Sequence, residues 1–507
     1  MEHIRRIYFS MSKGEKRYLR NFLSAFHVKG ENNALKLINI LERYPELRQA
    51  EMSEKLYGNP RSKAFLMMKS RLRERMMEVM ALSINLENNP GIREDQAGYI
   101  AIDIQKQLVY SVLLRRRGLY DVSRDVYQKC LKQARAAGFP EHEIQALLGL
   151  RNLAVTSSIE EVESYGDQIR KAVETFQTDL KASQVFDTFQ AHLQESAGTA
   201  DSALSFLDEN LKTVEDQLET HYSPRAHYYH LNLLVTRYQS KRDYQQAKEA
   251  LQELVDLLEA HRGIASKNRL GTSYLRLAAL ELQDYQFEES WRASRQAVSV
   301  FPKQKTNFMY ASTYLIFACL YRMQLSEADE ALSNLTYFRD RGRGGTYLDL
   351  LVYLESCLQY MKGNYRHAYD LLGDVPSLFA DKSGWNTSLR IYEIMLLIDR
   401  ELPDLASPKI EALRKHISRY QAQPRLEAMF RFLTLLERQS FDFQELSNEM
   451  KDILDHLTDT YLWDAVNPEV VRYDIWIRSH HLQRPFPRIF SAEIGRIGLI
   501  HAQQAST

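Results

Sequence analysis

The stretch Gly363-Asn364-Tyr365-Arg366-His367-Ala368 decides the fold of this chain. It places a glycine, an aromatic residue and then a small residue in the order expected where two antiparallel helices meet at a short turn. The signature recurs at four other places: Gly118-Leu119-Tyr120, Asp243-Tyr244 with Ala247, Tyr285-Gln286-Phe287 with Ser290, and Leu325 with Ala328. The four later copies lie roughly 38–43 residues apart, within or just above the period of two-helix repeats. The sequence therefore predicts a tandem array of helical hairpins.

The composition also favours helices. The chain has 507 residues but only 20 glycines and 13 prolines, so it offers few turns. Leu, Glu, Gln, Ala, Lys and Arg are abundant, and all are good helix formers. Strict alternation of apolar and polar residues is hard to find over more than a few positions. We therefore expect an all-α protein, longer than one compact core accommodates.

Three segments are expected along the chain. Residues 1–90 form an N-terminal helical domain that ends at the break Asn88-Asn89-Pro90-Gly91. Residues 91–465 form the repeat array. Residues 466–507 form a cap, because an open-ended stack needs a polar terminal element, and a disordered tail from His501.

Within the N-terminal domain, Ser12 is expected to cap a helix. The last helix of this domain, over about residues 61–86, is expected to turn one apolar side inward. That side consists of Phe65, Leu66, Met68, Leu72, Met76, Met77 and Met80.

Four hairpins are expected in the array: residues 102–116 with 122–136, 228–239 with 244–261, 272–283 with 288–300, and 348–361 with 365–372. The Gly- and Arg-rich residues 339–345 are expected to form a loop. No clean turn signature appears in residues 150–220 or 385–460, so the repeat register stays open there.

The hairpin signature is similar to the tetratricopeptide repeat, in a version with longer helices. The chain ends resemble a narrower family of large helical-repeat proteins from bacteroidete bacteria. The resemblance rests on Ser12-Lys13-Gly14-Glu15-Lys16-Arg17-Tyr18 and on Tyr473-Asp474-Ile475-Trp476-Ile477-Arg478-Ser479. The chain departs from that family at Leu19, where an aromatic is typical, and at His480, where a lysine follows the serine. The resemblance implies the α-solenoid fold and leaves the function open.

Charge and cysteine usage limit the class of protein. The net charge is +0, so a protein that coats nucleic acid is disfavoured, although residues 1–80 hold 17 Lys and Arg against 9 Asp and Glu. The three cysteines, Cys130, Cys319 and Cys357, are far apart and suggest buried thiols in a reducing compartment. No apolar stretch reaches the roughly 20 residues of a membrane span. We expect a cytoplasmic protein that does not bind membranes.

Catalytic and cofactor motifs are missing from the sequence. There is no G-x-x-x-x-G-K-[ST], no G-x-S-x-G and no H-E-x-x-H. His227 and His230, with His221 nearby, have a spacing that could share a metal, but no Cys, Asp or Glu at helical spacing completes the set. We therefore expect no enzyme, no cofactor and no metal.

Two sets of residues are candidates for binding a partner. First-helix side chains line the concave face of tetratricopeptide arrays, which here suggests a polar row of Tyr229, Asn232, Thr236 and Gln239. An asparagine there can clamp a peptide backbone through its amide, although an ordinary exposed helix face has the same composition. The second set is the basic face of the helix over residues 61–86, formed by Lys63, Lys69, Arg71, Arg73 and Arg75.

These candidates support two hypotheses. The first is a non-enzymatic scaffold that binds a protein or peptide along the groove of the repeats. The alternative is a nucleic-acid-binding regulator, in which residues 49–75 form a helix-turn-helix-like unit and the repeats act as a sensor or dimerisation module. Glu74 and Glu78 dilute the positive field of that unit, and its arginines point in different directions. The sequence does not indicate an oligomeric state.

Overall fold

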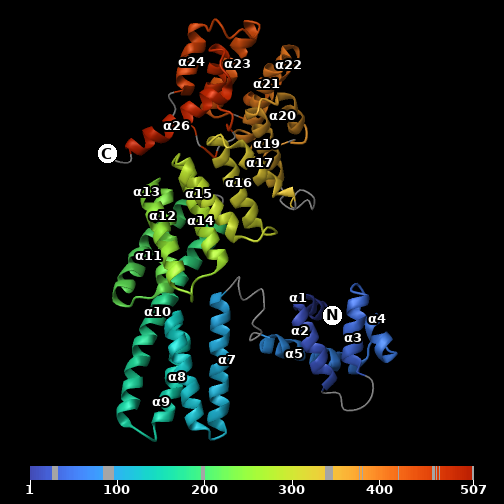
Figure 1. The fold of residues 1–507 in the computed structure, drawn as a ribbon, viewed down its shortest axis with the longest axis vertical. Coiled ribbons are helices and arrows are strands. Elements are labelled where there is room, and N and C mark those ends of the chain that lie inside the picture. The colour runs from blue at the N-terminus through green and yellow to red at the C-terminus, as the bar shows by residue number, and fades with distance from the viewer. Residues whose placement is uncertain are drawn as a thin grey trace. The chain divides into compact units, whose positions relative to one another are not determined.

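The computed structural model describes residues 1–25, 32–83, 96–195, 200–336, 338, 346–375, 377–379, 381–420, 422–458, 463, 465–466 and 469–504. Within these ranges the regular structure consists of 24 α-helices, which confirms the all-α prediction (Figure 1). The chain divides into two compact units, Met1–Phe176 and Gln177–Thr507, and each is described by itself. The break expected at Asn88-Asn89-Pro90-Gly91 and the loop expected at 339–345 lie outside the described residues.

Unit 1 begins with five helices that share one apolar core. They are α1 (Glu2–Ser10), α2 (Lys13–Ala25), α3 (Asn33–Arg43), α4 (Gln49–Tyr57) and α5 (Lys63–Ser83). The expected cap at Ser12 is present as a reciprocal pair: its backbone N–H donates to Glu15 Oε2 at 2.7 Å, and the Glu15 N–H donates to Ser12 Oγ at 3.2 Å. Tyr8 lies in the core and donates its hydroxyl hydrogen to Glu42, so it ties α1 to α3.

Fewer residues of α5 are buried than the sequence suggested. Its buried positions are Phe65, Leu72, Met76 and Val79. Leu66, Met77 and Met80 were expected to face the interior, but they are exposed. The reason is geometric, because α1 to α4 contact one stripe of this helix and a stripe holds about every third or fourth residue.

The rest of unit 1 starts the array. Helices α7 (Gln96–Arg116) and α8 (Tyr120–Ala137) form the first hairpin, and α9 (Pro140–Ala154) packs against α8. Gly149 on α9 lies directly under the ring of Tyr127 on α8, where a Cβ would come within 2.4 Å of the ring. A glycine there allows the two helices to pack closely.

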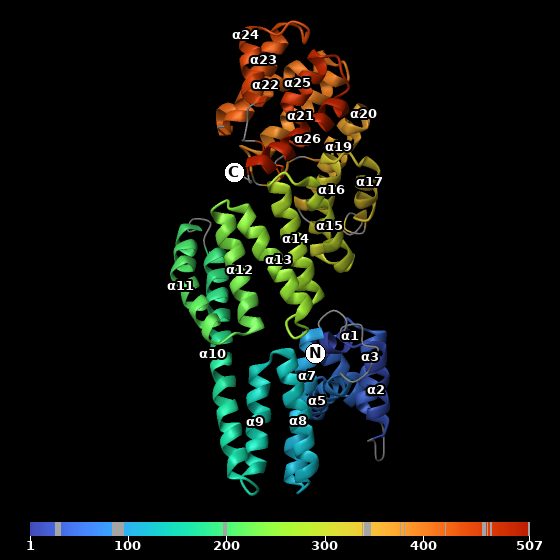
Figure 2. The ribbon, with the colours of Figure 1, turned by 60° about the vertical axis from the view of Figure 1, so that its left-hand side comes forward.

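Unit 2 continues the array with helices that run alternately up and down (Figure 2). Its first half contains α11 (Ala200–Thr220), α12 (Pro224–Ser240), α13 (Tyr244–Ala260), α14 (Lys267–Gln283), α15 (Phe287–Val300), α16 (Thr306–Tyr321) and α17 (Leu325–Ser333). Its second half contains α19 (Thr346–Met361), α20 (Tyr365–Leu372), α21 (Trp385–Asp399), α22 (Pro403–Tyr420), α23 (Pro424–Arg438), α24 (Asn448–Thr458), α25 (Tyr473–His481) and α26 (Phe486–Gln504). The four expected hairpins are α7 with α8, α12 with α13, α14 with α15, and α19 with α20, and all four are confirmed.

One backbone geometry closes the turn of most hairpins. A residue takes the left-handed conformation, and the N–H after it donates to the carbonyl five residues earlier, which is a Schellman motif; at Ser440 the next residue, Phe441, is left-handed as well. The left-handed residues are Gly118, Arg242, Tyr285, Met323, Gly363, Glu401, Ser440 and Gln483. The seven in unit 2 lie 38 to 43 residues apart. This spacing supplies the register that the sequence left open in residues 385–460, and it makes α25 with α26 the last hairpin.

Helix α10 (Ile159–Glu195) explains why the sequence showed no turn over most of residues 150–220. It is a single helix of 37 residues, about twice the length of its neighbours. By the repeat spacing it takes the place of a second helix and the following first helix without a turn between them. The division between the two units falls within it.

The end of the chain folds back onto the repeats instead of extending freely. Tyr285 and Tyr321 donate their hydroxyl hydrogens to the carbonyls of Trp463 and Ala465. Phe486 packs edge-on against Tyr360 at 5.2 Å between ring centres. Helix α26 reaches Gln504, four residues into the tail that was expected to be disordered from His501, and residues 505–507 lie outside the described residues.

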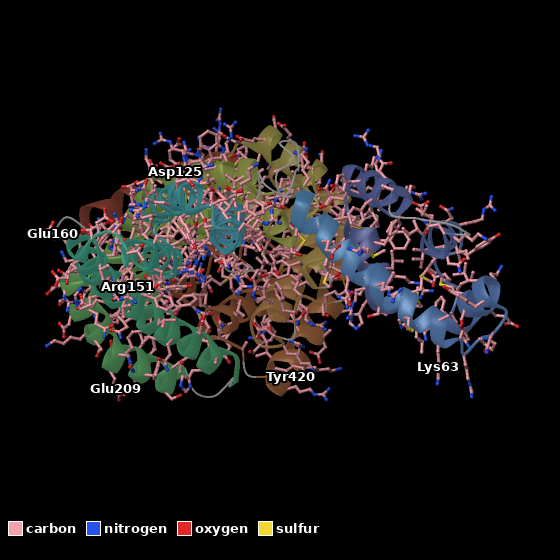
Figure 3. All side chains as sticks on the ribbon, turned by 90° about the horizontal axis from the view of Figure 1, so that it is seen from below. Lys63, Asp125, Arg151, Glu160, Glu209 and Tyr420 are labelled. Atoms are coloured by element: carbon pink, nitrogen blue, oxygen red, sulfur yellow. The ribbon has the colours of Figure 1, made fainter. Side chains whose placement is uncertain are left out.

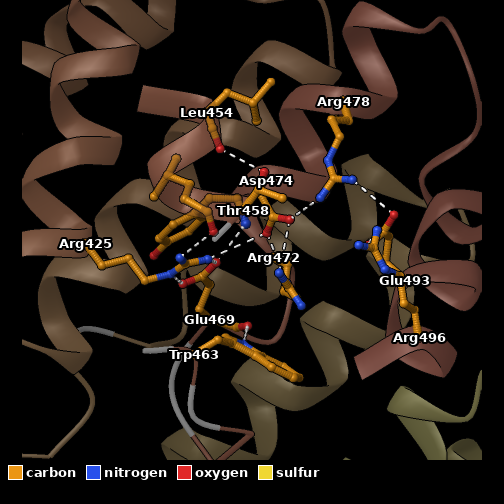
Figure 4. A network of polar contacts seen from close by, with 12 residues as sticks. Arg425, Leu454, Thr458, Trp463, Glu469, Arg472, Asp474, Arg478, Glu493 and Arg496 are labelled. Atoms are coloured by element: carbon orange, nitrogen blue, oxygen red, sulfur yellow. Dashed lines mark hydrogen bonds and ion pairs between the residues drawn. The ribbon is translucent and has the colours of Figure 1, made fainter. Parts of the chain in front are cut away.

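A buried ionic network fixes this return path (Figure 4). Arg425 at the start of α23 donates to Glu469 at 2.7 Å. Asp474, which is 0% exposed, accepts from Arg472 at 3.0 Å and from Arg478 at 2.6 Å. Burial alone would lower the pKa of Arg425, but the adjacent Glu469 carboxylate raises it above its ordinary value. The guanidinium group of Arg425 therefore stays charged and paired.

None of the described helices combines the length and apolar character that crossing a membrane requires.

Candidate binding site on the first-helix face

The candidate site lies where α12 meets α14, the first helices of two successive hairpins. Ser223 caps α12 and Pro224 occupies its first turn, while Ser266 caps α14 through the N–H of Arg269. Leu231, Leu233 and Val235 of α12 are buried. The side of α12 that faces α14 therefore carries the polar residues singled out in the sequence.

Three of those four residues converge on one side chain of α14. Arg276 donates from Nη1 to Asn232 Oδ1 at 2.8 Å, and from Nη2 to Thr236 Oγ1 and Gln239 Oε1, both at 3.4 Å. All four side chains are partly buried. The structure thus brings Asn232, Thr236 and Gln239 together around a cation that the sequence analysis did not include.

Asn232 is already engaged on both sides of its amide. Its Nδ2 donates to the Tyr228 carbonyl at 2.8 Å, and its Oδ1 accepts from Arg276. Thr236 donates to the Asn232 carbonyl at 3.0 Å. These residues therefore orient Arg276, and the amide of Asn232 is not free to clamp a peptide backbone.

The guanidinium of Arg276 has only neutral hydrogen-bond partners. No carboxylate among the described residues pairs with it, and burial lowers its pKa to about 10, an effect that Tyr228 partly offsets. At neutral pH the group is still charged. A partly buried cation that is held by dipoles alone gains most from an anion placed beside it.

Tyr228 and Tyr229 precede this cluster on α12. Arg269 lies over the Tyr228 ring at 4.4 Å from its centre. Tyr229, the fourth residue of the predicted row, does not contact Arg276; its ring packs on Tyr228 and on Phe186 of α10. Burial raises the pKa of Tyr229, so its hydroxyl stays neutral. The site therefore combines a cation, hydrogen-bond acceptors and two tyrosines.

Sequence reasoning missed Arg276 although a signal for it exists. Arg276 follows Asn232 by 44 residues and Gln239 by 37, which brackets the repeat length. Equivalent positions of successive repeats lie side by side in a solenoid. Adding one repeat length to the predicted row would have identified the arginine.

The histidines near the site do not converge. His227 approaches Glu253 at 3.1 Å and His230 approaches Glu215 at 3.2 Å, so each ring has its own carboxylate. Within the described residues no group of three or more His, Cys, Asp or Glu side chains is arranged to hold a metal.

The five basic residues of α5 do not form one surface. At about 100° per residue, Lys69 and Arg73 lie on one side of the helix, and Arg71 and Arg75 lie nearly opposite. Lys69 donates to Gln49 at 2.7 Å, and Arg75 pairs with Glu78 at 2.6 Å. Lys63 extends from the far end of α5 (Figure 3). This geometry does not favour contact with a single groove of nucleic acid, and the alternative hypothesis stays a prediction.

The three cysteines are all buried. Burial raises the pKa of Cys319 and of Cys357 to about 12 and that of Cys130 to about 11. Thiols with such values are protonated at neutral pH and are poor nucleophiles.

Comparisons with known proteins extend to the fold only. No protein-family model and no curated protein matches the chain. Among solved structures, the apo form of RapI is 10% identical, with 80% of this chain and 98% of that chain covered and a TM-score of 0.47. A Rap protein complexed with competence and sporulation factor is 12% identical, with coverages of 79% and 99% and a TM-score of 0.42.

A third similar structure is a signal transduction ATPase with a tetratricopeptide repeat sensor from Pyrococcus horikoshii. It is 14% identical, with coverages of 86% and 66% and a TM-score of 0.34. The chain is similar to these structures, and likenesses of this degree carry no argument about its class or its ligand. The resemblance to a bacteroidete family gains no support from them and stays a prediction.

Proposed function

We propose that this protein is a non-enzymatic scaffold that binds a peptide segment of a partner protein on the face of α12 and α14. The observation that carries the proposal is Arg276, whose guanidinium is held by Asn232, Thr236 and Gln239 and has no carboxylate partner among the described residues. The ligand feature expected beside it is a carboxylate, from an Asp or Glu side chain or from a C-terminus.

The energetics favour such a contact. Three of the five guanidinium N–H groups are used by the three neutral acceptors, which leaves Nε and one hydrogen of Nη1 for a ligand. A hydrogen bond between charged groups contributes about 1.5–3 kcal/mol. Because Arg276 is already oriented, binding costs little further side-chain entropy.

The neighbouring tyrosines add contact area. Tyr228 and Tyr229 are partly buried and lie on α12, one turn before Asn232, the residue that holds Arg276. Tyrosine and arginine are the residues that most often dominate the binding energy of protein interfaces. We therefore expect an apolar or aromatic ligand residue next to the acidic one.

The test is selection from a random peptide library displayed on phage, followed by affinity measurement of the selected peptides. We expect the selected sequences to share an acidic residue and to lose at least tenfold in affinity for the Arg276→Gln variant. Arg292→Gln is the matched control, because Arg292 is an exposed arginine on α15 that pairs with Glu289.

Two results would contradict the proposal. One is a selection that enriches no sequence above background. The other is a set of peptides whose affinity for the Arg276→Gln variant equals that for the unmodified protein.

A further inference from the structure

A second region of unit 2, away from the first-helix site, contains a cavity of about 640 Å³. It lies between the segment before α21, the first half of α21 and the end of α22. We call it the α21–α22 cavity. Its basic lining residues are Lys382, Arg390, Lys415, His416 and Arg419. Its apolar and aromatic lining residues are Leu372, Val375, Phe379, Leu389 and Tyr420.

The lining is strongly positive. Glu393 is the single carboxylate among the described lining residues, and Lys409 already binds that group at 2.7 Å. Lys415 is 3.8 Å from Glu411, which is itself engaged by Arg414 at 2.7 Å. Among the described residues, no carboxylate forms an ion pair with Lys382, Arg390 or Arg419. The described residues therefore do not neutralise the charge of the cavity wall.

The cations are held close to one another. Lys382 Nζ lies 5.2 Å from the centre of the Tyr420 ring, and the Arg419 guanidinium lies 5.3 Å from the same centre. His416 Nε2 is 2.8 Å from the Lys382 carbonyl; a carbonyl only accepts, so this nitrogen carries a hydrogen. Tyr420 itself is partly exposed.

Like charges gathered around one cavity repel each other, and a compact anion relieves that repulsion. Two arginines offer planar pairs of donors that match phosphate oxygens, and lysines add point charges. A single peptide carboxylate needs one such partner, whereas several cations around one space match a multiply charged group. The volume is within the range of small-ligand sites.

We propose that the α21–α22 cavity binds a small phosphorylated molecule with at least two adjacent phosphoryl groups. Arg390, Lys415 and Arg419 contact the phosphoryl oxygens. Leu372, Val375 and Phe379 line the part of the cavity that accepts an organic group, if the ligand has one. This site is independent of the peptide site at Arg276.

The experiment is isothermal titration calorimetry of the full chain at low and at moderate salt with pyrophosphate, ADP and inorganic phosphate. We expect pyrophosphate or ADP to bind at least tenfold more tightly than inorganic phosphate, with an affinity that falls as salt rises. Equal affinities for ADP and pyrophosphate identify the phosphoryl groups alone as the ligand. Tighter binding of ADP assigns a role to the organic group.

Variants locate the binding. Arg390→Gln combined with Arg419→Gln should weaken binding at least tenfold, because both side chains are exposed on the cavity wall and their replacement leaves the core unchanged. Arg431→Gln on the neighbouring helix α23, an exposed arginine that pairs with Glu449, is the matched control and should change the affinity less than twofold. Arg276→Gln should also leave it unchanged, which separates this proposal from the peptide site.

Three outcomes would overturn the proposal. The first is no binding of pyrophosphate or ADP at ~1 mM ligand, an affinity too weak to be specific. The second is binding that the double variant leaves unaltered. The third is a hexaglutamate peptide that binds more tightly than either phosphate compound through the same arginines.

Discussion

At the residue scale, Arg425 is a side chain on which the stability of unit 2 should depend strongly. It and Glu469 are 6% and 1% exposed. Replacing Arg425 with methionine leaves Glu469 buried beside an apolar group, and breaking a buried pair in this way costs about 3–5 kcal/mol. We expect a large loss in the free energy of unfolding of unit 2. Tryptophan fluorescence in urea measures it selectively, because all four tryptophans lie beyond residue 176.

The control for Arg425→Met is Arg414→Met, whose partner Glu411 is at the surface. That change should leave the urea midpoint unaltered. If both variants shift the midpoint equally, the ionic network does not hold the end of the chain.

His227 gives a prediction about pH. Burial lowers its pKa below the ordinary value of 6.5, and Glu253 offsets only part of that effect. The folded protein therefore takes up a proton at lower pH than the unfolded chain. Unfolding is favoured increasingly as the pH falls from 6.5 toward the folded-state pKa, while above 6.5 this contribution is absent. The groups that face His227 are Tyr222, His230, Glu253 and His261.

The measurement compares urea midpoints at pH 7.5 and 5.5 for the unmodified protein and for His227→Gln. We expect a smaller drop in the variant, which has no proton to take up at this position. Identical drops would show that His227 does not contribute to the acid sensitivity.

At this scale the sequence indicated that polar residues share one face of α12, but it did not show what they contact. Asn232, Thr236 and Gln239 do lie together, because they share one helix face. Their common partner Arg276 is a repeat away, and single-helix spacing does not reveal contacts between helices. Leu66, Met77 and Met80 illustrate the same limit, since an apolar residue is buried only where another element covers it.

At the scale of the element, two variants test how much the left-handed residue of a turn contributes to stability. Gly363 has φ 81°, and a Cβ there meets nothing within 4 Å, so Gly363→Ala costs only backbone strain, about 1–2 kcal/mol. Glu401 occupies the equivalent turn with φ 58°. Glu401→Gly removes that strain and loses about 0.4–1 kcal/mol in unfolded-chain entropy. We expect opposite shifts in the urea midpoint of unit 2, downward for the first variant and upward for the second.

Shifts of the same sign in both variants would mean that the left-handed residue does not control the stability of the turn.

Sequence motifs identify only some of these turns. The sequence signature marks the turns at Gly118, Asp243, Tyr285, Leu325 and Gly363, whereas it does not mark those at Glu401, Ser440 and Gln483. Their geometry comes from hydrogen bonds between backbone atoms, which leave little trace in residue type.

At the scale of the whole molecule, we expect each hairpin to be stabilised mainly by the segments that contact it. Each hairpin contacts mainly its neighbours, and the residues from Trp463 onward touch hairpins at Tyr285, Tyr321 and Tyr360. A chain that ends at Thr458 should lose hydrogen-exchange protection in α16, α19 and α21. Protection in α8 and α9 of unit 1 should not change, and mass spectrometry of exchanged peptides measures both.

Trp476→Ala is a milder version of the same change, because the Trp476 Nε1 donates to Asp399 of α21 at 3.0 Å. It should reduce protection in α21 and leave α8 unaltered. A uniform loss of protection along the whole chain in both variants would contradict the local character of the fold.

The large-scale plan was predictable from the sequence because hairpins repeat their chemistry. Two features were not. The repeat spacing predicts a turn within α10, but the helix continues without one. No residue in it signals that the turn is absent. The return of α25 and α26 onto earlier helices depends on contacts between residues more than a hundred positions apart, such as Tyr321 with Ala465, which no local pattern encodes.

The recurrence of one backbone bend between Met323 and Gly363 has a consequence for how such a protein lengthens. A segment that runs from one of these bends to the equivalent bend of the next repeat contains one complete pair of helices, and its two ends have the same backbone conformation. Copying that segment in tandem would place each new surface against the kind of surface it already matches. The number of repeats can therefore change by duplication without any change in the contacts between repeats. The length of the array is then set by the number of repeats.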